Sequence, residues 1–224
     1  MTDPARRSLA EVKERVLDAG KTLYERGLVE GTAGNVSGRV EGGNVVMTPS
    51  SLSYEEMTLD DLVVLQPDGT KVEGDRSPTS EKALHLAVYR DHADVQGVVH
   101  CHAKHASMFA VARMPIPAAI DEFIIYLGGD VAVCEYFPSG SDELGDEVAR
   151  HFKDRSAALM ANHGMVAIGK DVDDAMKNAM CVEHNAEIIW GASLLGGVVP
   201  LGEPHVTNFT NIYGFIREHM WGAE

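Results

Sequence analysis

Residues 95–102 read Val-Gln-Gly-Val-Val-His-Cys-His, an apolar run that ends in two histidines separated by one residue. The run predicts a buried β-strand. Because strand side chains alternate between faces, His100 and His102 should point one way and Cys101 the other. Two imidazoles about 7 Å apart on one strand face can close on a divalent cation. Two packed core histidines would give the same pattern, so other segments must decide between these interpretations.

Other segments of the sequence contain further residues of the types that bind metals. Residues 162–164, Asn-His-Gly, follow a second apolar run at 157–161, and a glutamate lies about twenty residues before the first histidine pair. Three imidazoles and one carboxylate suit a tetrahedral site for Zn²⁺ or a similar ion. The predicted ligands are His100, His102, His163 and Glu81.

Helical and strand patterns alternate along the chain. Helical spacing of apolar residues covers 9–24, 80–91, 104–113, 141–152 and 173–195. Short apolar runs predict strands at 44–47, 62–66, 71–73, 95–102, 131–135, 157–161 and 165–168. Most connections are too short for the crossovers of a parallel sheet. We therefore expect an α/β fold of three layers, α/β/α, with a mostly antiparallel central sheet, as a single domain over residues 1–224.

Composition narrows the class of protein. The chain has 224 residues, 45% of them hydrophobic, which fits one domain with a sizeable core. A formal net charge of -15 argues against nucleic acid as a partner. No apolar run approaches the roughly 20 residues of a membrane helix, and the first residues do not form a signal-peptide pattern. With three cysteines at no metal-like spacing, we expect a cytoplasmic protein with reduced thiols and no membrane contact.

Three turns combine hydroxyls, an amide and free backbone N–H groups. They lie at 34–37, 50–51 and 79–80, and the last of them opens a predicted helix. Concave N–H arrays and helix N-termini bind phosphate without a lysine. Each turn alone is typical of an ordinary chain reversal, so it is their combination with Glu81 that indicates an anion site.

The order of these motifs resembles the class II aldolase/adducin family. The matching segments are Gly-Thr-Ala-Gly-Asn-Val-Ser at 31–37, Thr-Pro-Ser-Ser at 48–51, Thr-Ser-Glu at 79–81, Val-Val-His-Cys-His at 98–102, Ile-Pro-Ala at 116–118 and Asn-His-Gly at 162–164. The resemblance spans residues 9 to about 196 in unbroken order. It is strongest to the members that cleave L-fuculose 1-phosphate.

The resemblance implies a role for each matching residue. The three histidines would hold one divalent metal per subunit, Zn²⁺ first and Mn²⁺ or Co²⁺ as alternatives. Glu81 would be the fourth ligand in the resting state. The implied phosphate contacts are Gly34, Asn35, Ser50, Ser51, Thr79 and Ser80. The resemblance also implies a homotetramer, by analogy with the ring-shaped members of the family.

The implied reaction is aldol cleavage of a ketose 1-phosphate, such as L-fuculose 1-phosphate or a related deoxy-ketose 1-phosphate, to dihydroxyacetone phosphate and an aldehyde. A divalent ion acts as the Lewis acid that lowers the energy of the enediolate product. Glu81, once displaced from the metal by substrate, would carry a proton to or from the enediolate carbon. The phosphate cradle would fix the reacting carbons in place. Few basic residues stand near the motifs, Lys82 and Lys104 being the nearest, which favours a monophosphate over a bisphosphate.

One departure from the family pattern concerns the second proton carrier. The aldolases carry a tyrosine four residues after the proline of the Ile-Pro motif, where this chain has Asp121 followed by Glu122. Relatives that epimerise ribulose 5-phosphate carry an acidic residue at the second of these positions. Tyr126 or Tyr213 could replace the missing phenol, and the acidic pair could instead be structural.

Alternative functions use the same histidine set. A pentulose-5-phosphate 4-epimerase performs the same retro-aldol step without releasing products, and a sugar-acid-phosphate decarboxylase or a methylthioribulose-phosphate dehydratase would need the same metal. A non-enzymatic, adducin-like scaffold domain is a further alternative. Adducin-type domains lack the metal histidines, so metal content separates the scaffold from the enzymes.

Overall fold

The computed structural model describes residues 7–221. The helices are α1 (Leu9–Glu25), α2 (Lys82–Asp91), α3 (Lys104–Ala112), α4 (Asp121–Leu127), α5 (Asp142–Arg150), α6 (Val172–Leu194) and α7 (Glu203–Met220), with one short 3₁₀ turn, η1 (Leu59–Asp61). The strands are β1 (Asn35–Arg39), β2 (Val45–Met47), β3 (Val63–Leu65), β4 (Lys71–Glu73), β5 (Gly97–Cys101), β6 (Val133–Cys134), β7 (Ala157–Met160) and β8 (Gly164–Gly169).

The strands form one 8-stranded sheet in the order β4-β3-β2-β1-β5-β8-β7-β6. Every neighbouring pair is antiparallel except β6 and β7, which are parallel. The expectation of a mixed α/β fold with a mostly antiparallel sheet is therefore confirmed. Short connections account for the antiparallel pairs β1–β2, β3–β4 and β7–β8, because a turn of a few residues can join only antiparallel neighbours.

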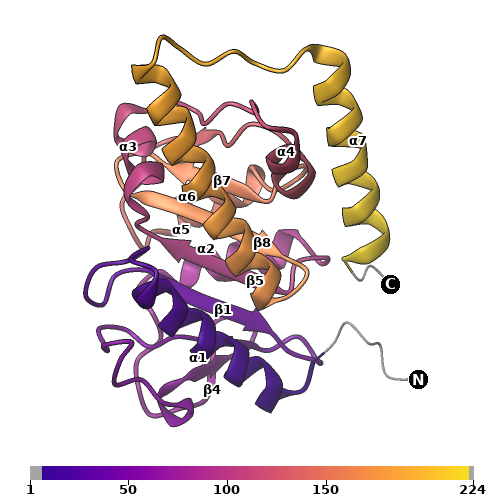
Figure 1. Ribbon diagram of the computed structural model, residues 1–224. Helices are drawn as coiled ribbons and strands as arrows, with labels where there is room; N and C mark the ends of the chain where they lie inside the picture. Colours follow the sequence, from indigo (N-terminus) through magenta and orange to yellow (C-terminus); the bar gives the residue numbers. More distant parts are fainter. Residues whose placement is uncertain (1–6, 222–224) are drawn as a thin grey trace.

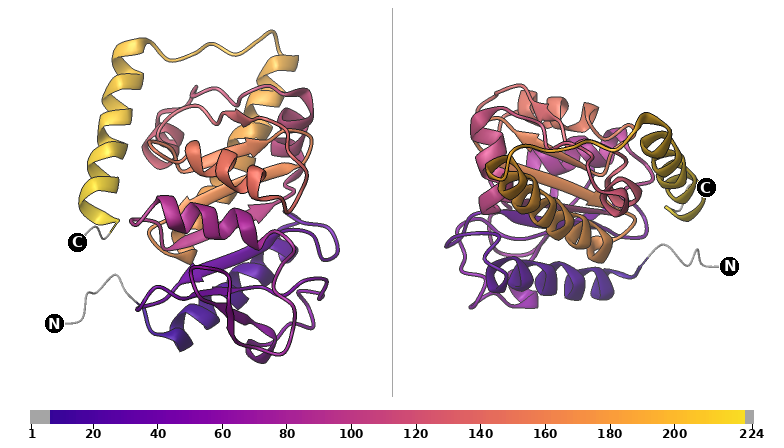
Figure 2. Two further views of the ribbon diagram at one scale, coloured as in Figure 1. Left: turned by 180° about the vertical axis from the view of Figure 1, so that it is seen from behind. Right: turned by 45° about the horizontal axis from the view of Figure 1, so that its top comes forward.

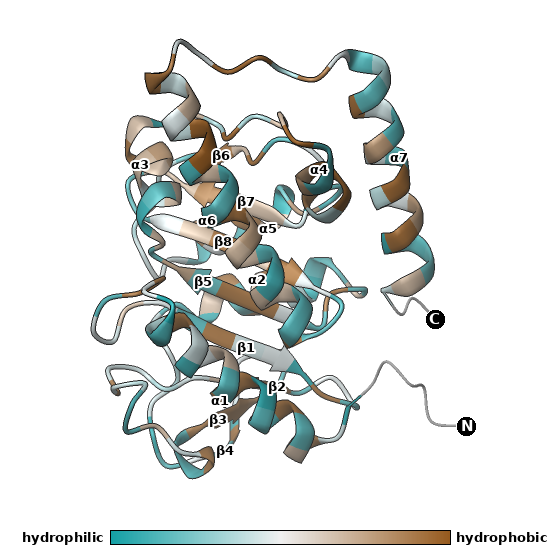
Figure 3. Cartoon of the chain, viewed as in Figure 1, coloured by the Kyte–Doolittle hydropathy of each residue, from teal (hydrophilic) through white to brown (hydrophobic). Residues whose placement is uncertain are grey.

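Buried side chains form two clusters, one with helices α1, α3 and α6 and the other with α2 and α5. Helix α6 packs on β5 and β8 beside α1, whereas α2 and α5 pack on each other (Figures 1 and 2). In Figure 3, α1, α6 and α7 carry alternating hydrophilic and hydrophobic bands, as amphipathic helices do. No helix within residues 7–221 is long and apolar enough to span a membrane.

Strand β5 lies in the middle of the sheet, between β1 and β8. Its side chains alternate as the sequence predicts: Val99 and Cys101 belong to the cluster with α1 and α6, and Val98 belongs to the opposite one. Asn35 of β1 is paired with His100 across the sheet. Paired residues share a face, so β1 places an amide beside the first histidine.

Two helices, α4 and α7, were not expected from the sequence. Helix α4 has only seven residues and ends at Gly128, whose φ of 87° belongs to the left-handed region. Helix α7 begins with Pro204 in its first turn and buries only Tyr213 and Arg217. A helix of about two turns, such as α4, or one with so narrow a buried face as α7, lacks the broad apolar stripe on which sequence patterns depend.

Candidate functional site

The three predicted histidines meet at one end of β5. His100 is the fourth residue of the strand, His102 follows its end, and His163 lies in the turn between β7 and β8. Their ring centroids are 4.8–5.0 Å apart, and the ligand nitrogens of all three lie within 4.8 Å of one another. His100 and His102 thus lie together, as the alternation along the strand predicts. The turn between β7 and β8 adds His163.

Glu81 contacts two of these imidazoles. Its Oε2 is 3.0 Å from Nε2 of His100, and its Oε1 is 3.4 Å from Nε2 of His163. The Nε2 atoms of His100 and His102 are 3.1 Å apart. Ligand bonds of about 2.0–2.1 Å at tetrahedral angles place ligand atoms about 3.3 Å from each other. The donor set and its spacing therefore fit one divalent cation.

The tautomer of His100 also suits a metal. Its Nδ1 lies 2.9 Å from the carbonyl oxygen of Met165 on β8. A carbonyl only accepts hydrogen bonds, so Nδ1 must carry a proton, which leaves Nε2 as the nitrogen that could bind a metal. The ring is completely buried, and it can therefore offer this nitrogen in only one direction.

Backbone geometry fixes the ligand turn at residues 162–164. Asn162 has a φ of 57°, in the left-handed region, and its Oδ1 accepts hydrogen bonds of 3.1 and 3.0 Å from the guanidinium of Arg113. A side chain on Gly164 would place its Cβ 2.5 Å from the carbonyl oxygen of Cys101 and 2.8 Å from the His102 ring. Both features explain why an Asn-His-Gly sequence carries the third ligand.

Burial and charge set the protonation states of the cluster. Burial would raise the pKa of Glu81, but the neighbouring His100 and His163 and a hydrogen bond from Asn35 outweigh it and hold that pKa far below its ordinary value. Burial and then the charge of His100 lower the pKa of His102 to about 4. The pKa of His163 is also lowered, by burial and by His100. Burial would lower the pKa of His100, but the adjacent Glu81 carboxylate outweighs burial and raises that pKa. Metal binding would therefore displace a proton from Nε2 of His100.

A cavity opens beside the cluster. Thr32, Ser139 and the side chains of Glu81, His102 and His163 line it. The candidate phosphate contacts also line it: Gly34, Asn35, Ser50, Ser51, Thr79 and Ser80. Among the described residues, no lysine or arginine does so. The structure therefore brings the three hydroxyl and glycine turns together around the imidazoles, which their separation in the sequence could not show.

Two of these turns each contain a residue with a left-handed backbone conformation. Gly34 has a φ of 75°, and a Cβ there would lie 2.8 Å from the His100 carbonyl oxygen. Ser51 also has a positive φ, 57°, which is uncommon for serine. The hydroxyl of Tyr54, a buried residue, donates a 2.9 Å hydrogen bond to the carbonyl of Gly34 and so holds this turn. Backbone N–H groups in turns can bind anions; in this cavity those of Ser50 and Thr79 already donate to the carbonyl oxygens of Ser77 and Thr48.

The four residues considered for the second proton carrier lie elsewhere in this chain. Asp121, Glu122 and Tyr126 belong to α4, where Glu122 accepts a 3.4 Å hydrogen bond from the Tyr126 hydroxyl. Tyr213 is a buried residue of α7, and its hydroxyl lies 2.8 Å from Ser156 Oγ. None of the four lines the cavity beside Glu81 in residues 7–221. Within one chain the Tyr213 hydroxyl is hydrogen-bonded to Ser156 and Arg217, away from this cavity.

Sequence reasoning missed Ser139 as a site residue. Its hydroxyl donates a 2.9 Å hydrogen bond to Oε1 of Glu81. The signal was the Pro-Ser-Gly-Ser turn at 138–141 before a predicted helix. Gly140 there has a φ of 78° and packs against the Ser80 carbonyl. This turn resembles the hydroxyl turns that were selected, but only the fold shows that it reaches Glu81.

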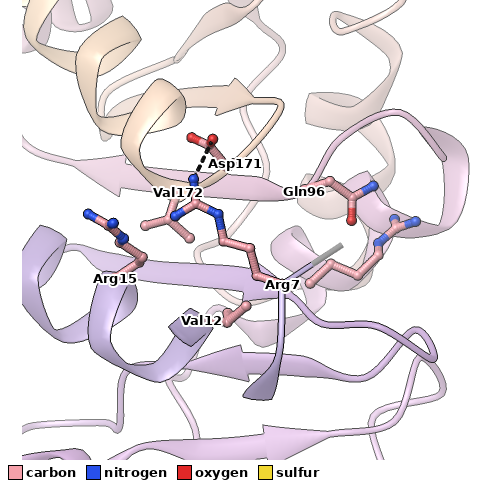
Figure 4. A pocket seen from close by; sticks show the side chains of 7 residues that line it. Arg7, Val12, Arg15, Gln96, Asp171 and Val172 are labelled. Carbon is pink, nitrogen blue, oxygen red and sulfur yellow. Dashed lines mark hydrogen bonds and ion pairs between the residues drawn. The ribbon is translucent and has the colours of Figure 1, made fainter. Parts of the chain in front are cut away.

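A second hollow lies on the other side of the molecule's centre, between α1, β1 and the start of α6 (Figure 4). Two of its arginines are paired with carboxylates, and the third, Arg39, donates hydrogen bonds to the carbonyl oxygens of Tyr89 and His92. Arg7 lies 3.1 Å from Asp171, the N-cap of α6, and both Arg7 and Arg15 lie within 3.5 Å of Asp173. These pairs tie Arg7 and α1 to α6, and, within residues 7–221, none of the four candidate metal ligands lines this hollow.

Comparison with known proteins defines the family. A model of the class II aldolase and adducin N-terminal domain matches residues 14–190, and the chain belongs to this family. It is 33% identical over 201 residues to 5-deoxy-D-ribulose 1-phosphate aldolase of Bacillus thuringiensis serovar kurstaki, covering 89% of this chain and 94% of that protein. It is 36% identical over 226 residues to L-ribulose-5-phosphate 4-epimerase UlaF of Salmonella paratyphi C, covering 94% and 96%.

A solved structure of an L-fuculose 1-phosphate aldolase has a similar fold. It superimposes with a TM-score of 0.87 at 32% identity, covering 95% of this chain and 100% of that one. The relatives named here are aldolases and an epimerase of sugar phosphates. Family and fold therefore agree with the resemblance drawn from the motifs, while the names of the relatives divide between two reactions.

Proposed function

We propose that this protein is a metal-dependent class II aldolase that cleaves a ketose 1-phosphate to dihydroxyacetone phosphate and an aldehyde. The observation that carries the proposal is the cluster of three imidazoles and Glu81, which opens onto a cavity lined by glycine and hydroxyl turns. The leading substrates are 5-deoxyribulose 1-phosphate and L-fuculose 1-phosphate, for which relatives are named.

His100, His102 and His163 would hold the ion, with Glu81 as the fourth ligand. We propose Zn²⁺, with Mn²⁺ and Co²⁺ as alternatives. When bound, the ion supplies Lewis-acid stabilisation of the negative charge left on the ketose oxygens as the carbon–carbon bond breaks. Glu81 holds the proton that is exchanged with the reacting carbon, since it is the carboxylate of the cavity.

The turns at Gly34, Ser50 and Thr79 would bind the phosphate through their hydroxyls and through backbone N–H groups other than those of Ser50 and Thr79, which donate to carbonyl oxygens. The absence of lysine and arginine from the described lining supports a single phosphate. A bisphosphate in a chain of net charge -15 would need a basic clamp for its second group. Binding of the remote phosphate fixes the carbon to be cleaved beside Glu81.

A pentulose-5-phosphate 4-epimerase is the second candidate, favoured by the 36% identity to UlaF. A sugar-acid-phosphate decarboxylase and an adducin-like scaffold are less well supported, the scaffold because its domains lack these histidines. A product screen decides among the enzymes. Cleavage of a ketose 1-phosphate with release of dihydroxyacetone phosphate supports the aldolase, and epimerisation of a pentulose 5-phosphate without cleavage would replace it.

Metal content tests the centre directly. The His100→Ala/His102→Ala variant should lose about one Zn²⁺ per chain while keeping its fold by circular dichroism. Cys134, Glu147 and His151 form another group of ligand atoms within 4.8 Å, so the comparison is made in a Cys134→Ser background. The matched control is His205→Ala/His219→Ala, which changes two exposed histidines of α7. Stoichiometric zinc in the first variant would contradict the proposal.

We also propose a cytoplasmic homotetramer built from a single three-layer α/β/α domain. The two core clusters, each with its own helices, support the layering. Exposed apolar side chains gather on the neighbouring helices α3 and α6, among them Val111 at 61%, Trp190 at 43% and Leu194 at 70% exposure. Such a patch supports association between chains. A second chain could then supply the proton carrier that the cavity of one chain lacks.

A further inference from the structure

A ladder of buried polar side chains leads away from Glu81 into the protein. Glu81, His85 and Tyr89 lie four residues apart along α2 and its N-cap, and Asn35 and Ser37 lie two residues apart on β1. His85 and Ser37 are completely buried, and the other three are at most 7% exposed. Burying so many polar groups costs stability unless each has a partner, and here each of them has one.

The two elements have matching spacings. Four residues of a helix rise about 6 Å, and two residues of a strand advance about 6.7 Å. The side chains of α2 and β1 therefore interleave in the order Glu81, Asn35, His85, Ser37, Tyr89. The contacts are 2.9 Å from Asn35 to Glu81, 2.5 Å from His85 to Asn35, 2.6 Å from Ser37 to His85 and 2.9 Å from Tyr89 to Ser37.

The chemistry of the groups gives every hydrogen bond one direction. A carboxylate only accepts, so Asn35 must turn its amide N–H toward Glu81 and its Oδ1 toward His85. Nε2 of His85 must then carry a proton. Burial lowers the pKa of His85 to about 3, so the ring is neutral and its Nδ1 accepts from the Ser37 hydroxyl. That hydroxyl oxygen in turn accepts from Tyr89.

We propose that His85 is a positioning residue for Glu81. By donating from Nε2 to Oδ1 of Asn35, it fixes which end of that amide faces the carboxylate, and Ser37 and Tyr89 fix the tautomer of His85. Asn35 then holds Oε2 of Glu81 while Ser139 holds Oε1. The carboxylate keeps one orientation even when it is not bound to metal. This inference rests on the proposed acid/base role of Glu81.

Amide orientation is the quantity that the ladder controls. If Nε2 of His85 lost its proton or were absent, the Asn35 amide would be held by Glu81 alone and could turn away from the carboxylate. Hydrogen bonds that run in one direction along such a ladder also polarise and strengthen one another. A histidine that only filled space beside α2 would have no such effect on Glu81, and this difference makes the inference testable.

The test compares two substitutions of His85 in the zinc-loaded enzyme, by the rate of solvent hydrogen exchange into saturating dihydroxyacetone phosphate. His85→Leu removes the donor and should lower that rate about tenfold or more. His85→Gln keeps an amide N–H that reaches Oδ1 of Asn35 and should remain within about threefold of the parent. The matched control is His92→Gln at the C-cap of α2, where the ring bonds the Ala149 carbonyl instead.

A double-mutant cycle separates positioning from a merely structural role. In a Glu81→Gln background, which carries no carboxylate to orient, His85→Leu should change the residual rate by less than about twofold. The same tenfold loss in both backgrounds would overturn the inference, as would full activity of His85→Leu. Full activity of Glu81→Gln alone would instead overturn the proposed function, and the two failures are thus distinguishable.

A spectroscopic measurement does not depend on activity. In ¹⁵N NMR of the histidine-labelled, metal-free protein at neutral pH, His85 should carry its proton on Nε2 and none on Nδ1. If His85→Leu does not fold, Ser37→Ala replaces it, since it removes the donor to Nδ1. That variant should show a mixture of tautomers and a lower exchange rate, and an unchanged tautomer with unchanged exchange would contradict the inference.

Discussion

Gly164 shows how closely single residues constrain the candidate metal centre. A Cβ at this position would lie 2.8 Å from the His102 ring and 2.5 Å from the Cys101 carbonyl. Gly164→Ala should therefore displace a ligand and weaken zinc affinity about tenfold or more, measured by competition with a chelator. The control is Gly191→Ala, in a helical position where a Cβ meets nothing within 4 Å. It should leave zinc affinity unchanged and raise stability by up to about 1 kcal/mol.

His85 should also leave a signature in the pH dependence of stability. Its pKa is about 3 in the folded protein, against 6.5 for an ordinary histidine. Because the folded pKa is depressed, the stability contributed by neutral, buried His85 is fully present above pH 6.5. This stability is lost as the pH falls toward 3. The loss is about 1.4 kcal/mol per pH unit within that window.

His85→Gln removes this titration, so the difference in unfolding free energy between parent and variant should shrink as the pH falls from 7 to 4. Urea unfolding of the metal-free proteins measures it. Parallel stability curves over this range would show that His85 does not titrate as its burial requires.

Among the helices, α6 supports the start of α3, directly after the His102 ligand. Glu183 of α6 accepts hydrogen bonds of 3.0 and 2.9 Å from the backbone N–H groups of His105 and Ala106. The N-cap of α3 is Ala103, which offers no side-chain cap. A carboxylate from another helix thus replaces the missing cap.

Glu183→Ala should lower the free energy of unfolding by about 1–2 kcal/mol, since helix caps contribute this much. Glu187→Ala, at an exposed position one turn further along α6, should change it by less than about 0.5 kcal/mol. Denaturant unfolding compares the two. Equal effects of both substitutions would contradict the capping role of Glu183.

Among the helices and strands, the sequence predicts those that have a clear local pattern of apolar residues. Helices α1, α2, α3, α5 and α6 and the strands around His100 follow from apolar periodicity, and the antiparallel pairing of consecutive strands follows from short connections. Helix α4 was missed because it has seven residues, and α7 because it buries only two of its side chains. The ladder from Glu81 to Tyr89 was equally invisible, since it depends on α2 lying along β1, which only the packing of the whole chain decides.

For the molecule as a whole, the motif order was sufficient to identify the family, and the fold brought three distant hydroxyl and glycine turns to one cavity. It did not bring Asp121, Glu122, Tyr126 or Tyr213 there. No local pattern reports which side of a sheet a short helix such as α4 will cover. If chains associate, residues on the outside of one subunit can still complete the site of another.

Sedimentation velocity tests this association. We expect a tetramer at micromolar concentration, since the apolar side chains on α3 and α6 would be covered. Val111→Glu, at a 61% exposed position, should shift the distribution toward smaller species, whereas Lys153→Glu, at an exposed position after α5, should not. A monomeric parent protein would contradict the proposed assembly.

The central claim is that Glu81 exchanges a proton with the substrate carbon beside a metal held by three histidines. The most direct measurement is solvent hydrogen exchange into dihydroxyacetone phosphate, which needs no aldehyde, by the zinc-loaded parent and Glu81→Gln. Zinc content should be equal in both, because the amide keeps a ligand oxygen. The parent should exchange the carbon-bound hydrogen and the variant should be slower by about 10² or more. Exchange by Glu81→Gln at the parent rate, or no exchange by the parent, would contradict the account.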